Sequence, residues 1–184
     1  QLPNVVSQEE EIALNAIQST YHVDEKYQAT TNSFLQSCVK VLKDAPVTLL
    51  REHYRCHPRI IDFCNQRFYN GELIAMTSDN NEGKVLQVIK TVPGNHARGH
   101  FNQREIDVII QEVMPEYSTS DSVGIITPYR DQAIAINQAL GKDVASTVHK
   151  FQGRECDAII MSMVDNIPTD FSDDPNLMNV AISR

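Results

Sequence analysis

Short apolar runs rich in β-branched residues alternate with helical patterns in the second half of the chain, and this alternation constrains the fold more than any other feature. Three runs, at residues 122–127, 144–148 and 158–164, have the composition of buried strands. A helical pattern over residues 131–140 connects the first two. Strands joined through helices of this length form parallel units with right-handed crossovers. We therefore predict an α/β fold with an open, mostly parallel sheet and helices on both faces.

The N-terminal part of the chain carries helical patterns and no strand signal. Ser7 and Glu10 have the spacing of a capping box, which starts many helices. A second apolar periodicity runs through residues 34–42 before a proline interrupts it. A chain of 184 residues suits about one domain with an appendage. We expect a helical segment over residues 1–45 and the α/β domain over residues 46–184.

Four further elements are expected ahead of the first buried strand. They are a strand at 47–50, a helix from Pro58 to Phe68, a strand at 85–91 and a helix at 103–114. Pro58 suits the first turn of its helix, where a backbone amide hydrogen is not needed. The intervening residues are polar and turn-rich, which is typical of loops.

Composition excludes several classes of protein. No apolar run is long enough to cross a bilayer, and no basic segment followed by an apolar one marks a secretory leader. The four cysteines lack CxxC spacing, so we expect reduced thiols in a cytoplasmic, intracellular protein and no structural zinc. His96 and His100 share a loop but have no identifiable partner ligands, and the aspartates of residues 165–174 lack the calcium-loop pattern, so no metal site is predicted. The chain does not start with Met, and we expect that it begins inside a longer protein or was processed.

Polar clusters follow three of the expected strands, at residues 51–59, 127–132 and 147–155. Parallel strands place their carboxyl ends along one edge of a sheet, where ligands bind, so these clusters are expected on one rim. The arginines of the first cluster offer planar forks of donors that suit phosphate oxygens. Thr127 ahead of Pro128 puts a hydroxyl and free backbone amides at a helix start, an arrangement that suits an anion.

Each cluster also has a simpler explanation. The first can be a solvated basic loop that caps the next helix, the second an ordinary helix start, and the third a turn between strands. The C-terminal residues 179–184 can be a fraying end. No complete Walker A phosphate loop (GxxxxGK[ST]) occurs in the sequence.

The clusters taken in order resemble a known set of motifs. The matching segments are residues 54–58 (Tyr-Arg-Cys-His-Pro), 125–132 (Ile-Ile-Thr-Pro-Tyr-Arg-Asp-Gln), 151–155 (Phe-Gln-Gly-Arg-Glu) and 179–184 (Asn-Val-Ala-Ile-Ser-Arg). They resemble the second RecA-like domain of superfamily 1 helicases, with most similarity to the up-frameshift-like branch. Gln1-Leu2-Pro3 resembles the end of the motif that closes the first RecA-like domain. The resemblance implies a RecA-like fold of the P-loop NTPase type in an ATP-dependent helicase.

The resemblance implies a nucleotide site shared with the first RecA-like domain of the same protein. Its implied catalytic residues are Arg184, Arg55 and Gln1, and its implied nucleotide-contacting residues are Tyr54, Arg55, Gly153, Glu155 and Arg184. Tyr54 would stack on the adenine, Arg55 and the arginine finger Arg184 would reach the γ-phosphate, and Gln1 would sense it. Glu155 would lie near the ribose and phosphates. The ATP would carry Mg²⁺, held mainly by the first domain.

The second partner that the resemblance implies is single-stranded DNA or RNA. No membrane partner is expected. The residues that resemble backbone-contacting positions are Thr127, Pro128, Tyr129, Thr147 and His149. ATP-driven closure and reopening of the two domains would step the protein along the strand. This chain by itself is expected neither to hydrolyse ATP nor to unwind a duplex.

Departures from the motifs keep other classes of function open. Cys56 replaces a usual Met, Ser183 a usual Thr, and His149-Lys150 a usual Asp-Ser pair, and the chain stops before the strand that normally follows the last motif. An alternative is a degenerate RecA-like module that binds nucleic acid or protein without motor activity. An unrelated nucleotide-binding α/β enzyme would need a phosphate loop of its own, and the sequence has none.

The net charge of −8 by itself argues against a nucleic-acid partner. The charges are unevenly placed, however. Residues 51–59 hold three arginines and one glutamate, whereas residues 165–174 hold four aspartates and residues 9–11 three glutamates. The expected rim is therefore basic although the chain is acidic, and we expect weak, salt-sensitive binding of nucleic acid by this domain.

Overall fold

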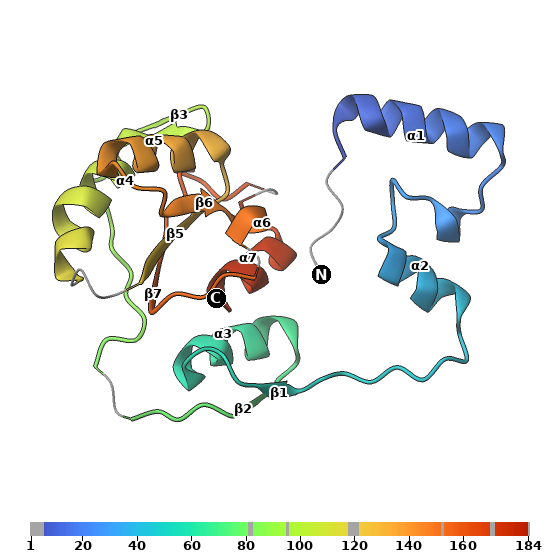
Figure 1. Ribbon diagram of the computed structural model, residues 1–184, viewed down its shortest axis with the longest axis horizontal. Helices are drawn as coiled ribbons and strands as arrows, with labels where there is room; N and C mark the ends of the chain where they lie inside the picture. The colour runs from blue at the N-terminus through green and yellow to red at the C-terminus, as the bar shows by residue number, and fades with distance from the viewer. Residues whose placement is uncertain are drawn as a thin grey trace. The chain divides into compact units, whose positions relative to one another are not determined.

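The computed structural model describes residues 6–80, 83–94, 96–117, 122–151, 153–169 and 172–183 (Figure 1). The chain divides into two compact units, residues 1–50 and residues 51–184. Within the described ranges, no helix is both long and apolar enough to cross a membrane.

The first unit contains the two helices that the sequence predicts. Its elements are α1 (Gln8–Thr20), the short helix η1 (Glu25–Tyr27) and α2 (Phe34–Val41). Both α-helices start at capping boxes: Ser7 N donates to the Glu10 carboxylate at 2.8 Å, and Ser33 N donates to Gln36 Oε1 at 2.7 Å. The prediction of a strand at 47–50 is wrong, because these residues pair with no strand in the described ranges and Leu50 is 85% exposed.

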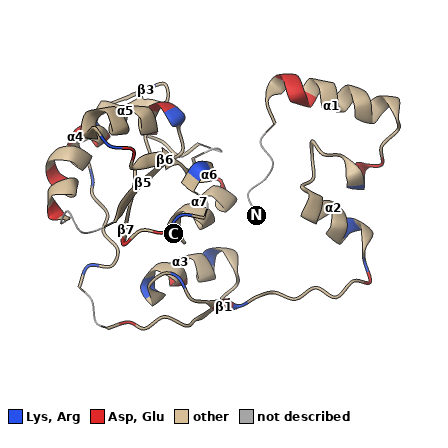
Figure 2. Cartoon of the chain, viewed as in Figure 1, with Lys and Arg blue, Asp and Glu red and all other residues tan. Residues whose placement is uncertain are grey.

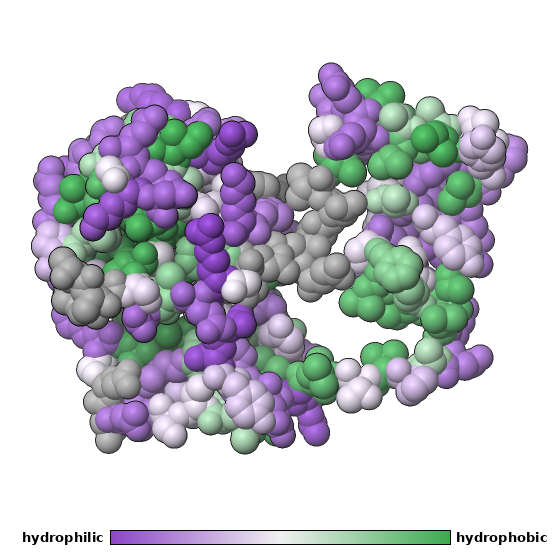
Figure 3. All heavy atoms as spheres, viewed as in Figure 1, coloured by the Kyte–Doolittle hydropathy of each residue, from purple (hydrophilic) through white to green (hydrophobic). Residues whose placement is uncertain are grey.

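The interior of the first unit is polar. Gln18 and Asn32 are its buried residues, and no apolar side chain is buried among its described residues. Gln18 bonds the Ala29 amide at 2.8 Å and the Thr30 hydroxyl at 3.2 Å. Figure 3 shows hydrophobic atoms on the surface of α1 and α2, where large apolar side chains of both helices are exposed.

The second unit is built on a parallel three-stranded sheet. Its strands are β5 (Val123–Thr127), β6 (Ala145–Thr147) and β7 (Ala158–Met161), in the order β6-β5-β7. Ile125 of the central strand lies opposite Ala145 on one side and Ile160 on the other. These are the three strands that the sequence predicts, and the predicted parallel sheet is confirmed; β5 is mostly buried, whereas β7 is half-buried.

Successive residues of β5 face opposite sides of the sheet, and helices cover both sides. Ile125 packs with buried side chains of α4 (Gln103–Val108), the continuing turn η2 (Ile109–Val113) and α5 (Arg130–Leu140). Gly124 faces α6 (Val148–Phe151) on the other side, and a side chain there would overlap the Phe151 ring. The helix α7 (Pro175–Ile182) lies next to α6. The predicted α/β class with helices on both faces is confirmed, and it is the arrangement of a RecA-like domain.

The helix α3 (Pro58–Phe68) packs against α7 and starts as predicted. His57 caps it by accepting the Arg59 amide on Nδ1 at 3.2 Å, and Pro58 occupies its first turn. The hydroxyl of Tyr69, directly after α3, accepts a hydrogen bond from the Asn179 amide at 2.9 Å. This contact joins the segment after Arg55 to the last predicted motif.

The remaining elements are short. They are the parallel pair β1 (Glu52–His53) and β2 (Ile74–Ala75), the hairpin β3 (Ala97–Arg98) and β4 (Phe101–Asn102), and the single turn η3 (Met114–Glu116). The strand predicted at 85–91 is not formed; Val88 there is 85% exposed and no strand lies beside the segment in the described part of the chain. The polar stretch at 147–155, for which a turn between strands was the simpler explanation, contains α6.

Candidate functional site

Arg55 and Glu155, predicted from two motifs a hundred residues apart, form an ion pair. The Nε of Arg55 lies 2.7 Å from Glu155 Oε1, and the side chains are 38% and 64% exposed. Arg55 lies two residues after the end of β1, and Glu155 follows the turn after α6. An ion pair this exposed contributes about 0–1 kcal/mol to stability. It therefore orients the guanidinium but is weak enough for another anion to replace Glu155.

Tyr54 precedes Arg55 in the sequence, and Gly153 lies two residues before Glu155. The Tyr54 side chain is exposed, and its hydroxyl donates a hydrogen bond to the Glu52 carboxylate, which raises the pKa of the phenol. The ring is thus fixed at one edge while its faces meet solvent. Gly153 has a φ of +91°, a backbone region that side chains disfavour, and it lets the chain turn from α6 toward Glu155.

Cys56, the residue after Arg55, belongs to a buried cluster that contains a second thiol. Cys56 is 7% exposed and Cys64 of α3 is fully buried. Burial raises the pKa of the Cys64 thiol to about 11, and burial also lowers the pKa of His53, whose Nε2 lies 3.0 Å from Cys56 Sγ. These groups are therefore uncharged at neutral pH.

A cavity of about 560 Å³ opens beside Arg55. His57 and Lys84 contribute further basic groups to its lining, while apolar side chains of β7 and α7 form much of the remainder. The apolar part does not suit a triphosphate. Arg55, which pairs with Glu155, is one of the residues that line this cavity.

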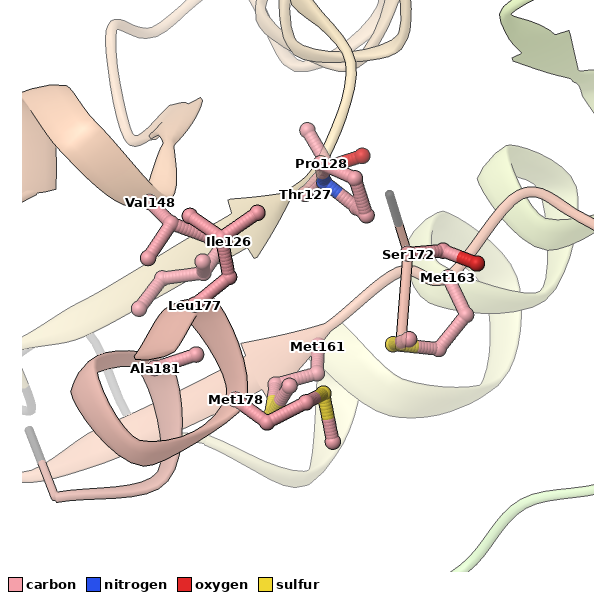
Figure 4. Close-up of a pocket in the computed structure, with 10 residues that line it drawn as sticks. All are labelled: Ile126, Thr127, Pro128, Val148, Met161, Met163, Ser172, Leu177, Met178 and Ala181. Atoms are coloured by element: carbon pink, nitrogen blue, oxygen red, sulfur yellow. The ribbon is translucent and has the colours of Figure 1, made fainter. Parts of the chain in front are cut away.

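Two residues predicted to contact nucleic acid, Thr127 and Thr147, are neighbours across β5 and β6. Thr127 is fully buried and its hydroxyl accepts the Tyr129 amide at 3.4 Å, whereas Thr147 is half-buried. Figure 4 shows Thr127 and Pro128 at the end of β5, lining a small apolar pocket with side chains of α7 and three methionines, Met161, Met163 and Met178. Thr127 shapes this rim through its turn; its hydroxyl does not face solvent.

His149 stands at the start of α6, directly after Val148. Its side chain is half-buried, and its Nε2 is shielded from solvent without a hydrogen-bond partner among the described residues. A buried polar atom without a partner costs free energy, so such an atom in a folded protein calls for an explanation. A ligand that supplies the partner is one such explanation. His149 therefore stays a candidate contact.

Tyr129 has two partners that the sequence did not indicate. Its hydroxyl donates to Asp165 Oδ2 at 2.7 Å, and its ring stacks on His100 with centroids 4.4 Å apart and planes 2° from parallel. Burial and the hydrogen bond to Asp165 raise the pKa of Tyr129. Sequence reasoning placed His100 in a loop and Asp165 in an acidic run; the missing signal is the fold, which brings both to the end of β5.

A buried polar network holds the turn that carries Asp165. Val164 is fully buried with a φ of +68°, a strained conformation for a β-branched residue. Its amide donates to the Glu105 carboxylate at 3.0 and 3.1 Å, and its carbonyl accepts from Asn102 Nδ2 at 2.9 Å. Gln132, which is fully buried, links Asn102 to Ser162 of the same network. The strain is compensated by these bonds, and Asp165 is fixed as a result.

Gln1 and Arg184, two of the predicted catalytic residues, lie outside the described residues. The others fall into two groups on the second unit. Tyr54, Arg55, Gly153 and Glu155 gather around one ion pair, and Thr127, Pro128, Tyr129, Thr147 and His149 follow the carboxyl ends of β5 and β6. Arg55 is the basic residue of the first group, and Figure 2 shows basic residues beside the second group, at the start of α5 and in α6.

Comparison with known proteins yields one protein family and several relatives. A family model described as an AAA domain matches residues 30–184. The chain is 32% identical over 158 residues to the 5′-3′ DNA helicase ZGRF1 of Mus musculus, which covers 74% of this chain and 8% of that protein. It is 28% identical over 169 residues to the helicase sen1 of Schizosaccharomyces pombe (74% and 10%). It is 24% identical over 178 residues to the DNA polymerase alpha-associated DNA helicase A of Saccharomyces cerevisiae (75% and 26%). The chain thus spans about a quarter or less of the length of these relatives.

Proposed function

The chain belongs to the AAA-domain family of superfamily 1 helicases, in the up-frameshift-like branch, and we propose that it is the second RecA-like motor domain of an ATP-dependent helicase that moves along single-stranded DNA or RNA. The observation that carries this proposal is the Arg55–Glu155 ion pair. It brings two of the helicase-like motifs together at one solvent-facing point.

The nucleotide side of the proposal rests on groups that fit a triphosphate. Arg55 holds a carboxylate oxygen at 2.7 Å, and a γ-phosphate offers anionic oxygens to the same donors. Tyr54 has exposed ring faces on which an adenine can stack. In this proposal Arg184 joins Arg55 at the γ-phosphate, Gln1 senses it, and Glu155 and Gly153 lie against the ribose and phosphates. Bound Mg²⁺, held mainly by the first motor domain, would neutralise phosphate charge during phosphoryl transfer.

The strand side rests on the rim at the ends of β5 and β6. Backbone amides after Thr127, together with Pro128, Tyr129, Thr147 and His149, would grip phosphates and sugars without reading sequence. The grip would be weak for this domain by itself, because the first motor domain shares the strand. Salt should weaken it further by counterion release.

The helical unit has a place in the same proposal. Its exposed apolar side chains on α1 and α2 suit burial against a larger body. We infer that residues 1–45 are a helical segment that follows the end of the first motor domain in the chain, and that residues 46–184 form the second. ATP would then bind between the two motor domains and draw them together.

The test compares two variants of the intact protein. Arg55→Ala should lower strand-stimulated ATP turnover by roughly a thousandfold, the scale of a lost phosphate-contacting arginine, and leave the Kd for single strands nearly unchanged. Thr147→Ala should weaken strand binding and leave turnover at saturating strand intact. Normal turnover in Arg55→Ala would refute the motor assignment and favour a binding module without motor activity. ATPase activity of the 184-residue chain by itself would refute the two-domain division.

A further inference from the structure

An aromatic pair stands at the rim where the strand is proposed to bind. His100 lies in the two-residue turn between β3 and β4, and Tyr129 directly precedes α5. Their rings are stacked in parallel, 4.4 Å apart with an interplanar angle of 2°. The hairpin is held against α5 by hydrogen bonds between Asn102 and Gln132. The pair is therefore a feature of the fold and not of one flexible loop.

One face of this pair is open. Tyr129 is half-buried, whereas His100 is exposed. Since Tyr129 covers one face of the imidazole, the exposed surface of His100 consists of its other face and its edges. The outward face of His100 is thus the end of a stack of two rings.

The stack is preorganised. The Tyr129 hydroxyl is fixed by Asp165 at 2.7 Å, and Asp165 follows Val164, whose backbone is held by the half-buried Glu105 and the buried Asn102. Asp165 also accepts from the Thr169 hydroxyl at 3.3 Å, so its carboxylate is engaged at the hydroxyl end of the tyrosine. A ligand that stacks on His100 would meet rings that are already ordered, which reduces the entropy cost of binding.

The charges next to the stack suit a nucleic acid. Arg98 precedes the turn that holds His100, and Arg130 directly follows Tyr129; both are exposed. Neighbouring Cα atoms are about 3.8 Å apart, so each ring has a guanidinium on a nearby stem. Aromatic faces beside cationic side chains are the combination that proteins use to hold single strands, with bases on the rings and phosphates on the charges.

We propose that His100 is a base-stacking residue: a nucleobase of the bound single strand stacks on its outward face, on the platform formed with Tyr129. The proposal rests on the proposed function and adds a contact to the base where the rim motifs imply contacts to the backbone. A stack reads no hydrogen-bonding edge, so this contact is tolerant of sequence. DNA and RNA offer the same base faces, and both are suitable strands.

The test separates base contacts from backbone contacts. The Kd of the intact protein is measured for a single-stranded oligo-dT and for an abasic strand of the same length and charge, at one fixed salt concentration. His100→Ala should raise the Kd for oligo-dT roughly 5- to 100-fold, the range for one lost stacking contact, and leave the Kd for the abasic strand unchanged. His100→Phe should restore oligo-dT binding, because it keeps a flat ring.

Lys142→Ala is the matched control. Lys142 is exposed at the opposite end of α5, beyond Leu140, and its loss should change neither Kd. An equal loss on both strands in His100→Ala, or no loss on either, overturns the stacking proposal. Failure of the wild-type protein to bind either strand overturns the proposed function as well. If His100→Ala binds both strands as tightly as the wild type and keeps its ATP turnover, the result overturns only the stacking proposal and leaves the proposed function intact.

Discussion

Both units of the chain contain α-helices, but they bury their apolar residues to very different extents. In residues 51–184, apolar side chains of α4, α5 and α7 are buried on the sheet. In residues 1–50, the described buried residues are Gln18 and Asn32, while Phe34 is 85% exposed. Capping boxes thus define where α1 and α2 begin, but local signals do not supply a core. The second unit therefore has a buried apolar core, whereas the described residues of the first unit do not form one.

The comparison can be tested most strongly with one isoleucine from each unit. Ile136 of α5 is fully buried, whereas Ile17 of α1 is 54% exposed. Ile136→Ala should lower the free energy of unfolding by about 2–5 kcal/mol, and Ile17→Ala by less than about 0.5 kcal/mol. Urea denaturation followed by circular dichroism measures both in the 184-residue chain. Equal costs would mean that the first unit has a core of its own.

A second pair of variants compares the buried glutamines. Gln132 lies inside the network that holds Val164, and Gln18 bonds Ala29 and Thr30. Gln132→Ala should lower the free energy of unfolding by about 1–3 kcal/mol, because the buried backbone amide of Asn102 loses its acceptor and Ser162 keeps only its hydrogen bond to Glu105. Gln18→Ala should cost less, since water can replace it in a unit without a dry core. Only Gln132→Ala should also weaken strand binding, because it loosens the hairpin that carries His100.

Helix starts, buried strands and the order of the motifs could be predicted from the sequence because they are local. The capping box of Ser7, the Pro58 helix start and the apolar run of β5 all met expectation. The strand predicted at 85–91 did not form because β-branched residues specify a strand only when another strand lies beside them. The stacking of His100 on Tyr129 and the bond from Asp165 were not predictable, since each depends on segments that only the folded chain brings together.

The buried cluster of Cys56, Ile61 and Cys64 in the second unit should make the stability of the protein depend on pH. The pKa of Cys64 is raised to about 11 by burial, so the folded state keeps its proton while the unfolded thiol loses it near pH 9. The unfolded state then binds fewer protons, and the stability contribution of Cys64 should be present below pH 9 and lost as pH rises toward 11. Stability measured by urea titration from pH 7 to 11 should fall less steeply in Cys64→Ala than in the wild type.

Ile61→Val is the control for this pH dependence. Ile61 belongs to the same buried cluster and carries no ionisable group. It should lower stability by about 0.5–1.5 kcal/mol at every pH and leave the slope unchanged. A slope in Cys64→Ala equal to that of the wild type would show that the thiol is not shielded when the protein is folded.

The smallest effect on stability is expected for the ion pair that carries the functional proposal. Arg55–Glu155 has a counterpart in the first unit, Lys26–Asp24 at 3.3 Å, and both pairs are exposed. Because exposed ion pairs contribute about 0–1 kcal/mol, Glu155→Gln and Lys26→Ala should both unfold close to the wild type in urea. The two variants should differ in ATP turnover by the intact protein. Glu155→Gln should change the turnover, and Lys26→Ala should leave it unchanged. A stability loss in Glu155→Gln large enough to explain its altered turnover would make the pair a structural contact, and the difference between the two units would then lie in packing only.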